Sequence, residues 1–255
     1  VPESYDPSKP TPLVITIHGF AQWPAHQMHI TRWNDLADEY GFIAVYPVGT
    51  RFPMRWRIVG ETGSSLDPMR DVTFISDLID KLAADYNIDS SRIYANGLSN
   101  GGGMSFLLSC KMSDRIAAIG TVAGAFNLPW DDCQPSRPVP TMVFHGTEDP
   151  IVPYAGGRYH DTDFFFPAIP DWAATLAGRN GCNPDPDELP ASGQVSGVQY
   201  EGCNADVVFY TITGGGHTWP GGEPIPERIA GYTSPDIDAT RVLWDFFLAH
   251  PLPGK

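Results

Sequence analysis

The sequence has little positive charge, and this argues against a nucleic-acid partner. Lys and Arg together number 16 against 30 Asp and Glu, which gives a formal net charge of −14 at pH 7. Binding to DNA or RNA depends largely on cationic side chains that neutralise phosphates. We therefore expect no nucleic-acid binding, and interpret the acidic balance as a well-solvated surface.

Long apolar runs are also lacking. A helix that crosses a bilayer needs about 20 consecutive apolar residues, and no run in this sequence approaches that length, so no membrane span is expected. No internal repeat, polar linker or low-complexity segment divides the 255 residues, which favours a single domain, 1–255, with a sizeable core. Because the chain begins with Val1 rather than Met, we expect it to be excised or processed from a longer chain.

Cysteines are few, but their number is even. Four cysteines allow three pairings. Cys182 and Cys203 bracket a loop rich in Pro, Asp and Gly that has little else to hold it, and Cys110 and Cys133 remain as a second pair. The alternative is four reduced, buried thiols in an intracellular protein. We favour disulfides, and with them a secreted, extracellular protein.

Short apolar runs alternate with segments of helical periodicity. The expected strands are 13–17, 42–46, 92–95, 116–122, 141–144 and 207–212. The expected helices are about 28–40, 71–86, 104–108 (past the glycines at 102 and 103), 171–178 and 236–249. This alternation predicts an α/β fold with a mostly parallel central sheet and helices on both faces. In such sheets the chemistry lies in loops at the carboxyl ends of the strands.

The third expected strand runs into Gly97-Leu98-Ser99-Asn100-Gly101, which fits the pattern Gly-x-Ser-x-Gly. A strand, a sharp turn that carries a serine, and then a helix are typical of a nucleophile elbow. The alternative is a Gly-rich turn that happens to hold a serine. The strand–helix context favours the elbow, with Ser99 as the nucleophile.

Two later strands also end in reactive side chains. The strand 141–144 is followed by Glu148 and Asp149, and the strand 207–212 by His217 in a glycine-rich loop. The resulting order Ser…Asp…His is that of the α/β-hydrolase fold, in which histidine takes the serine proton and the acid orients the histidine. Either carboxylate could be the acid, and we favour Asp149 because it is shorter and precedes a proline.

Other histidines have weaker claims to a catalytic role. His18 and His145 each precede a glycine at a strand end and are expected to brace loops. His26 and His29 form a loose His-x-x-His pair without accompanying acidic ligands, so no metal site is expected.

The remaining parts of a hydrolase site are less well defined by sequence. An oxyanion hole needs two backbone N–H groups, for which we expect Asn100 and Phe20, with Ala21 as a close second to Phe20. Aromatic residues gather in the same loops, and Trp56 and Trp219 are expected to line a substrate groove. Ordinary core packing is the alternative for each tryptophan.

Four segments carry a resemblance to a known family: 18–19, 97–102, 145–154 (His-Gly-Thr-Glu-Asp-Pro-Ile-Val-Pro-Tyr) and 214–221 (Gly-Gly-Gly-His-Thr-Trp-Pro-Gly). Together with 180–182 and Cys203 they resemble the secreted polyhydroxybutyrate depolymerase and feruloyl esterase group, carbohydrate esterase family 1. The resemblance implies a triad of Ser99, Asp149 and His217, disulfides Cys110–Cys133 and Cys182–Cys203, and no cofactor. Substrates of the group include feruloylated or acetylated plant polysaccharides, hydroxyalkanoate polyesters and small synthetic esters.

The sequence departs from this group in two places. Members usually have an N-terminal strand pair before the segment that matches residues 1–5, so an edge strand is missing here or the domain was cut from a longer protein. The segment 50–68 matches no substrate-defining pattern, which leaves the acyl specificity to this loop and to the aromatic run 164–166.

The sequence thus predicts a serine carboxylesterase that acts through an acyl-enzyme on small or polymeric esters. Feruloyl or acetyl esters of plant polysaccharides, or small acyl esters, are the expected substrates, and a polyhydroxyalkanoate depolymerase is the alternative. A serine peptidase is disfavoured because no gating domain is evident. A non-catalytic binding module is disfavoured because the serine, aspartate and histidine are all present.

Overall fold

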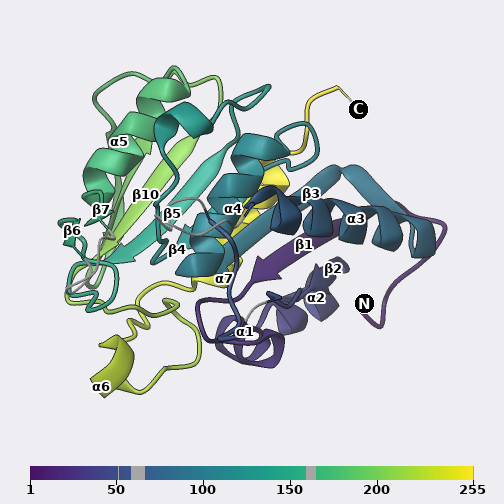
Figure 1. The fold of residues 1–255 in the computed structure, drawn as a ribbon, viewed down its shortest axis with the longest axis horizontal. Coiled ribbons are helices and arrows are strands. Elements are labelled where there is room, and N and C mark those ends of the chain that lie inside the picture. The colour runs from purple at the N-terminus through teal and green to yellow at the C-terminus, as the bar shows by residue number, and fades with distance from the viewer. Residues whose placement is uncertain (51, 59–66, 159–164, 255) are drawn as a thin grey trace.

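An eight-stranded sheet forms the centre of the molecule (Figure 1). The computed structural model describes residues 1–50, 52–58, 67–158 and 165–254. In spatial order the strands are β2 (Ile43–Val45), β1 (Thr11–Ile17), β3 (Ile88–Leu98), β4 (Ile119–Val122), β5 (Thr141–Gly146), β10 (Val207–Ile212), β9 (Val195–Tyr200) and β8 (Asp187–Ser192). The first six are parallel, and β9 and β8 add an antiparallel edge. The predicted α/β-hydrolase fold class is confirmed.

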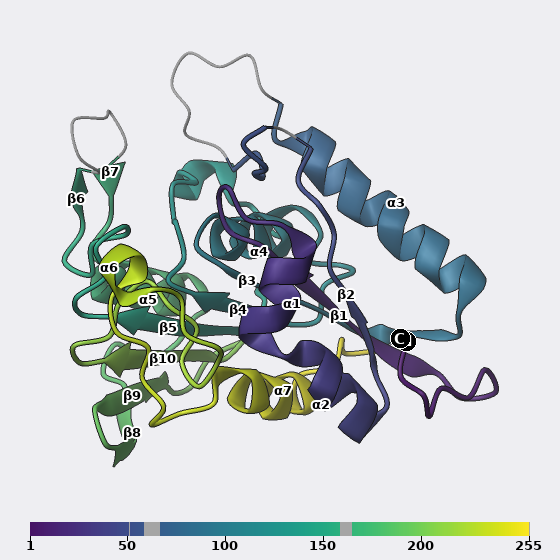
Figure 2. The ribbon, with the colours of Figure 1, turned by 90° about the horizontal axis from the view of Figure 1, so that it is seen from below.

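Helices cover both faces of this sheet (Figure 2). They are α1 (Pro24–Thr31), α2 (Trp33–Tyr40), α3 (Met69–Asp85), α4 (Asn100–Lys111), α5 (Ile169–Arg179), α6 (Glu227–Ala230) and α7 (Ala239–Ala249), with a 3₁₀ turn at Trp130–Asp132 and a small separate pair of strands, β6 (Gly157–Arg158) and β7 (Phe165–Phe166). One apolar cluster joins the sheet to α3, α4 and α5, and a second joins it to α2 and α7. None of the helices in the described ranges is long and apolar enough to cross a membrane.

The sequence pattern of the central strands follows from this double cover. All seven residues of β1 are buried, as are the last six of β3. A strand buried on both faces has no solvent-exposed face that needs polar side chains. Its sequence is therefore a continuous apolar run rather than an alternation of apolar and polar residues. Parallel sheets of this type bind their ligands at the edge formed by the carboxyl ends of the strands.

Three local expectations need correction. The helix expected over 28–40 is two helices, because Arg32 adopts a left-handed conformation (φ 52°) that interrupts the backbone bonding. The glycines after the elbow lie inside α4, which begins at Asn100. The loop expected between Cys182 and Cys203 contains the β8–β9 hairpin, whose exposed, polar β8 lacks an apolar signal.

Both disulfides are present in the structure, as predicted. Cys110–Cys133 ties the end of α4 to the segment after the 3₁₀ turn, and Cys182–Cys203 closes the base of the β8–β9 hairpin. The first lies in the core and the second is half-buried.

Candidate active site

Ser99 lies at the sharp turn between β3 and α4 and has a positive φ of 58°. A non-glycine residue in such a conformation carries strain of about 1–3 kcal/mol, which persists only where the surroundings fix the backbone. Here Ser99 N–H donates to Val122 O at 2.9 Å, and its carbonyl accepts from Ala125 N at 3.0 Å. The serine is therefore held in a strained conformation by its neighbours, as a nucleophile elbow requires.

The two outer glycines of the motif are required by close approach rather than by φ. A Cβ on Gly101 would lie 2.1 Å from Ile17 O, at the end of β1. A Cβ on Gly97 would lie 2.4 Å from the carbonyl carbon of Gly101. The start of α4 is thus packed directly against the backbone that leads into the first loop.

His217 and Asp149 are joined by a hydrogen bond between buried side chains. His217 Nδ1 lies 2.8 Å from Asp149 Oδ2, and Asp149 Oδ1 accepts the backbone N–H groups of Ile151 and Val152, each at 2.8 Å. The carboxylate can only accept, so Nδ1 carries the proton and Nε2 is left as the basic nitrogen. Of the two carboxylates considered from sequence, Asp149 is the partner of His217.

The electrostatic surroundings keep Asp149 ionised. Burial by itself would raise the pKa of Asp149, but the two adjacent histidines, His217 and His145, lower it by more, so the pKa lies well below its usual range. A buried carboxylate that remains charged stabilises a positive charge on His217.

Backbone contacts between two loops bring these residues together. Glu148 N–H donates to Gly215 O at 2.9 Å and Thr147 N–H to Ile212 O at 2.9 Å. A Cβ on Gly146 would lie 2.1 Å from Gly215 O, so only glycine permits this approach. The loop after β5 and the loop after β10 are consequently packed against each other.

Ser99 is not hydrogen-bonded to His217 among the described residues. The two side chains come from loops at the same edge of the sheet, after β3 and β10. Such contacts are often long in the absence of substrate and shorten when it binds.

The structure distinguishes between the candidates for the oxyanion hole. Ala21 N–H donates to Met54 O at 2.8 Å and is therefore already engaged. The N–H groups of Phe20 and Asn100 have no acceptor among the described residues. Phe20 is thus favoured over Ala21, and Asn100 begins α4, whose N-terminal end favours negative charge.

His18 braces the loop that carries Phe20. Its Nδ1 lies 2.7 Å from Gly19 O and its Nε2 lies 3.0 Å from Gly49 N. Since a carbonyl only accepts and an amide N–H only donates, the ring is the neutral Nδ1–H form. Burial lowers the pKa of His18, against a smaller opposing effect of the bond to Gly19.

Residues 54–57 form a second support, which sequence reasoning missed. Trp56 N–H donates to Asn100 Oδ1 at 2.7 Å, Asn100 Nδ2 donates to Trp56 O at 3.2 Å, and Trp56 Nε1 donates to His18 O at 3.1 Å. Arg57 is anchored on α3 by the buried Asp71, with Arg57 Nη1 2.6 Å from Asp71 Oδ1. No sequence signal identifies these partners, because each lies in a different element.

The groove role expected for Trp56 and Trp219 does not fit the structure. Trp56 is 2% and Trp219 1% exposed, and Trp219 Nε1 donates to Thr240 Oγ1 in the core. Exposed aromatic side chains among the described residues include Phe20, Trp23 and Phe52 in loops and Phe165 in β7. Phe164, His160 and much of the segment 50–68 fall outside the described residues.

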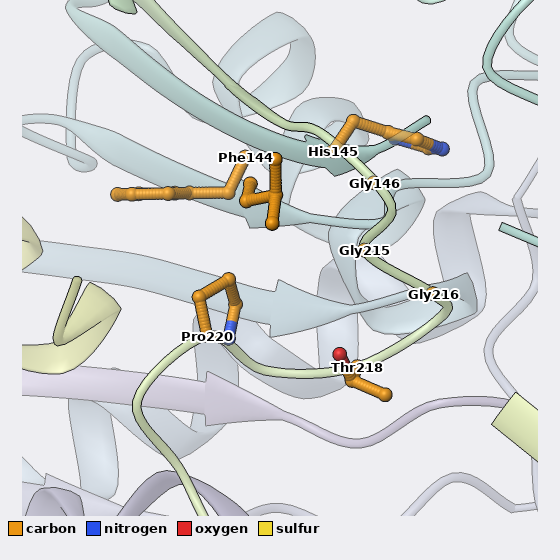
Figure 3. Close-up of a pocket in the computed structure, with 8 residues that line it drawn as sticks. Phe144, His145, Gly146, Gly215, Gly216, Thr218 and Pro220 are labelled. Carbon is orange, nitrogen blue, oxygen red and sulfur yellow. The ribbon is translucent and has the colours of Figure 1, made fainter. Parts of the chain in front are cut away.

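A small cavity lies between the end of β5 and the loop after β10 (Figure 3). It is bounded by Phe144 and Gly146 from β5 and by Gly215, Thr218 and Pro220 from the loop after β10. Its volume of ≈ 10 Å³ is near the lower limit for one water molecule. The cavity is therefore too small to hold an acyl group.

No group of three or more His, Cys, Asp or Glu side chains that could hold a metal ion occurs in the described part of the chain. His26 lies beside Trp23 rather than in a ligand cluster, with ring centroids 5.8 Å apart.

Comparisons with known proteins show that the sequence is similar to esterases. The family model "Esterase PHB depolymerase" matches residues 7–128, slightly less than half of the chain. A feruloyl esterase C of Emericella nidulans is 27% identical over 258 residues, covering 98% of this chain and 82% of that protein. A bifunctional acetylxylan esterase/xylanase of Neocallimastix patriciarum is 34% identical over 144 residues, which cover 56% of this chain and only 20% of that protein.

The fold has close counterparts among solved structures. An acetyl xylan esterase from Aspergillus awamori superposes with a TM-score of 0.65 at 15% sequence identity, covering 90% of this chain and 89% of that one. The mostly parallel sheet with helices on both faces is the fold of the α/β-hydrolase esterases. The chain is thus similar to α/β-hydrolase esterases, including feruloyl esterases and the polyhydroxybutyrate depolymerase family, which is consistent with the predicted resemblance.

Proposed function

We propose that Ser99, His217 and Asp149 are the catalytic triad of a serine carboxylesterase. The observation that carries the proposal is the 2.8 Å hydrogen bond between the buried His217 and Asp149, at the same sheet edge as the strained Ser99. His217 Nε2 takes the proton of Ser99 Oγ as the oxygen attacks the ester carbonyl carbon. The carbonyl oxygen then becomes an oxyanion, which the N–H groups of Phe20 and Asn100 stabilise.

The same histidine completes the reaction. The tetrahedral intermediate collapses, the bond to the alcohol oxygen breaks, and His217 returns the proton to the leaving alcohol. Water then loses a proton to His217 and attacks the acyl carbon. The bond between this carbon and Ser99 Oγ breaks, the acid leaves, and His217 returns the proton to Ser99 Oγ. Asp149 stays ionised throughout and stabilises the charged imidazole.

The substrates that we propose are feruloyl or acetyl esters of plant polysaccharides, or small acyl esters. Support comes from the named relatives and from apolar side chains on the loops around the site, where Phe20 and Trp23 are each about half exposed. A polyhydroxyalkanoate polyester is the second candidate, supported by the family model. The two disulfides support a secreted protein that works in an oxidising, extracellular environment.

Substitution of the triad tests the catalytic proposal. Ser99→Ala is expected to abolish labelling by a fluorophosphonate and nearly all hydrolysis of p-nitrophenyl acetate while the thermal unfolding midpoint stays close to that of the wild type. Asp149→Asn is expected to lower kcat by about 10³-fold or more, because it removes the acceptor that fixes the tautomer of His217. Near-wild-type activity of Ser99→Ala would refute the assignment.

A substrate panel tests the specificity. Hydrolysis of methyl ferulate, acetylated xylan, polyhydroxybutyrate and p-nitrophenyl esters of increasing chain length should be compared as kcat/KM. Preference for methyl ferulate or acetylated xylan supports the polysaccharide esterase, whereas preference for the polyester supports the depolymerase.

A further inference from the structure

Asp149 contacts a second histidine besides His217. Nε2 of His145 lies 3.4 Å from Asp149 Oδ2, the same oxygen that His217 Nδ1 contacts at 2.8 Å. The nearer acceptor for His145 Nε2 is the carbonyl oxygen of Val152, at 2.9 Å. Both imidazole rings and the carboxylate are buried. One carboxylate oxygen therefore lies between two imidazole rings.

The position of the His145 proton follows from these neighbours. The Val152 carbonyl and the Asp149 carboxylate can only accept, so Nε2 must carry the hydrogen. Nδ1 of His145 is buried and is bonded to no described residue. All of the hydrogen bonding of this ring is thus directed at the segment 149–152.

Few other polar groups face the ring. The charged or titratable groups near it are Asp149, His217 from the loop after β10, and Tyr154, whose ring centroid is 6.1 Å away and whose hydroxyl pairs with Thr211. Figure 3 shows the ring of His145 leaving β5 in the direction opposite to Phe144. The ring therefore contacts the Val152 carbonyl and the Asp149 carboxylate, and it also lines the small cavity.

Resting on the proposed function, we propose that His145 is a positioning residue for the acid of the triad. Its Nε2–H fixes the turn 149–152 through the Val152 carbonyl and shares part of the negative charge on Asp149 Oδ2. This contact orients the carboxylate toward His217. It also weakens the stabilisation that Asp149 gives to protonated His217, so that His217 returns its proton more easily to the leaving alcohol.

This role has a consequence that a purely structural brace lacks. When the second N–H is removed, Asp149 Oδ2 carries more charge toward His217 and stabilises its protonated form more strongly. The fall of kcat/KM at low pH, here called the acidic limb of the pH profile, occurs as His217 becomes protonated. This acidic limb should then move to higher pH. A brace that only supports the fold would change stability and leave this limb in place.

The test compares His145→Leu with His145→Gln. The side-chain amide of glutamine can place an N–H near the position of Nε2, whereas leucine has no donor. Activity on p-nitrophenyl acetate is measured from pH 5 to 9 and divided by the concentration of active sites titrated with a fluorophosphonate, so that loss of folded protein does not count. His250→Leu is the matched control, because His250 also bonds a carbonyl and a carboxylate. These belong to Phe246 in α7 and to Asp206, which directly precedes β10.

For His145→Leu we expect kcat to fall about tenfold with little change in KM, and the acidic limb to rise by roughly half a pH unit. His145→Gln should recover most of both, and His250→Leu should change neither. An unmoved acidic limb in His145→Leu, or a glutamine variant as impaired as the leucine variant, would overturn the proposal. If the leucine variant does not fold, His145→Asn replaces it, because its shorter amide does not reach the Nε2 position. The same losses are then expected, and an unmoved acidic limb again overturns the proposal.

The same assays separate this inference from the proposed function. If Ser99→Ala is inactive and unlabelled while the His145 variants behave like the wild type, the triad stands and the role of His145 fails. If Ser99→Ala remains active, the triad itself fails.

Discussion

The side chain of Asn100 and the backbone of Trp56 are joined by two reciprocal hydrogen bonds, of 2.7 and 3.2 Å. Asn100 directly follows the nucleophile, and Trp56 also bonds the carbonyl of His18 in the loop that carries Phe20. A single pair of residues therefore links both proposed oxyanion donors. These hydrogen bonds of Trp56 to Asn100 and His18, here called the clamp, hold the two donors together alongside the close packing of Gly101 on Ile17.

Breaking the clamp should impair catalysis more than stability. For Asn100→Ala we expect kcat to fall about 10- to 100-fold with little change in KM, because small displacements of a catalytic group are costly. Steady-state kinetics with p-nitrophenyl acetate measure this. Asn34→Ala removes an amide whose hydrogen bond within the described part of the chain is to the neighbouring Asp35, and it should leave kcat unchanged. Equal kinetics for the two variants would contradict the role of the clamp.

Close packing at the elbow should make Gly101 intolerant of a methyl group. A Cβ there meets Ile17 O at 2.1 Å, so Gly101→Ala must displace either α4 or the end of β1. We expect a loss of about 1–3 kcal/mol in the free energy of unfolding, together with loss of activity, measured by urea denaturation and kinetics. Gly178→Ala is the control: it lies in α5 with nothing within 4 Å of its Cβ and should be neutral or stabilising. Similar effects at the two glycines would be inconsistent with the steric argument.

The neutral His18 should make the protein sensitive to acid. Burial depresses the pKa of His18 from 6.5, so the unfolded chain binds this proton more readily than the folded one. Stability from this site is complete above about pH 6.5 and is lost as pH falls from there toward the lower folded pKa. A protonated ring also cannot accept the N–H of Gly49.

His18→Gln tests this dependence, because its amide oxygen can accept from Gly49 without titrating. The unfolding midpoint of the wild type should fall more between pH 7.5 and pH 5 than that of His18→Gln. His29→Gln, at an exposed position, should retain the wild-type pH dependence. Parallel curves for the wild type and His18→Gln would rule out the proposed effect.

The two disulfides should differ in their accessibility to reductant. Cys182 and Cys203 are half-buried, whereas Cys110 and Cys133 are 2% and 4% exposed. Mild reduction followed by alkylation and mass spectrometry should therefore label Cys182 and Cys203 first. Labelling in the opposite order would contradict this assignment of exposure.

Removal of either disulfide should also lower stability. The bridges close loops with sequence separations of 21 and 23 residues, for which the chain-entropy model gives about 3 kcal/mol each. Cys182→Ala/Cys203→Ala should unfold at lower urea concentration yet keep its kcat, since the hairpin β8–β9 lies at the far edge of the sheet from β3. A large loss of kcat at 25 °C in this double variant would show that the hairpin supports the site.

Sequence alone determined the parts of this protein that depend on local pattern. Continuous apolar runs identified the parallel strands, because a doubly covered strand has no polar face. The position of Ser99, Asp149 and His217 at one edge of the sheet followed from their places after three parallel strands, whose carboxyl ends meet at that edge. The edge hairpin β8–β9 gave no such signal, since its exposed residues are as polar as a loop.

Only the tertiary structure decided how the site is held. In the structure, the N–H of Ala21 is bonded to Met54, and Trp56 and Trp219 are buried in the core. His145 and His217 contact the same oxygen of Asp149. Each of these contacts joins residues from loops whose paths are fixed by packing against other elements. A hydrogen bond needs a distance and an angle, and neither is contained in the type of a residue or in its position along the chain.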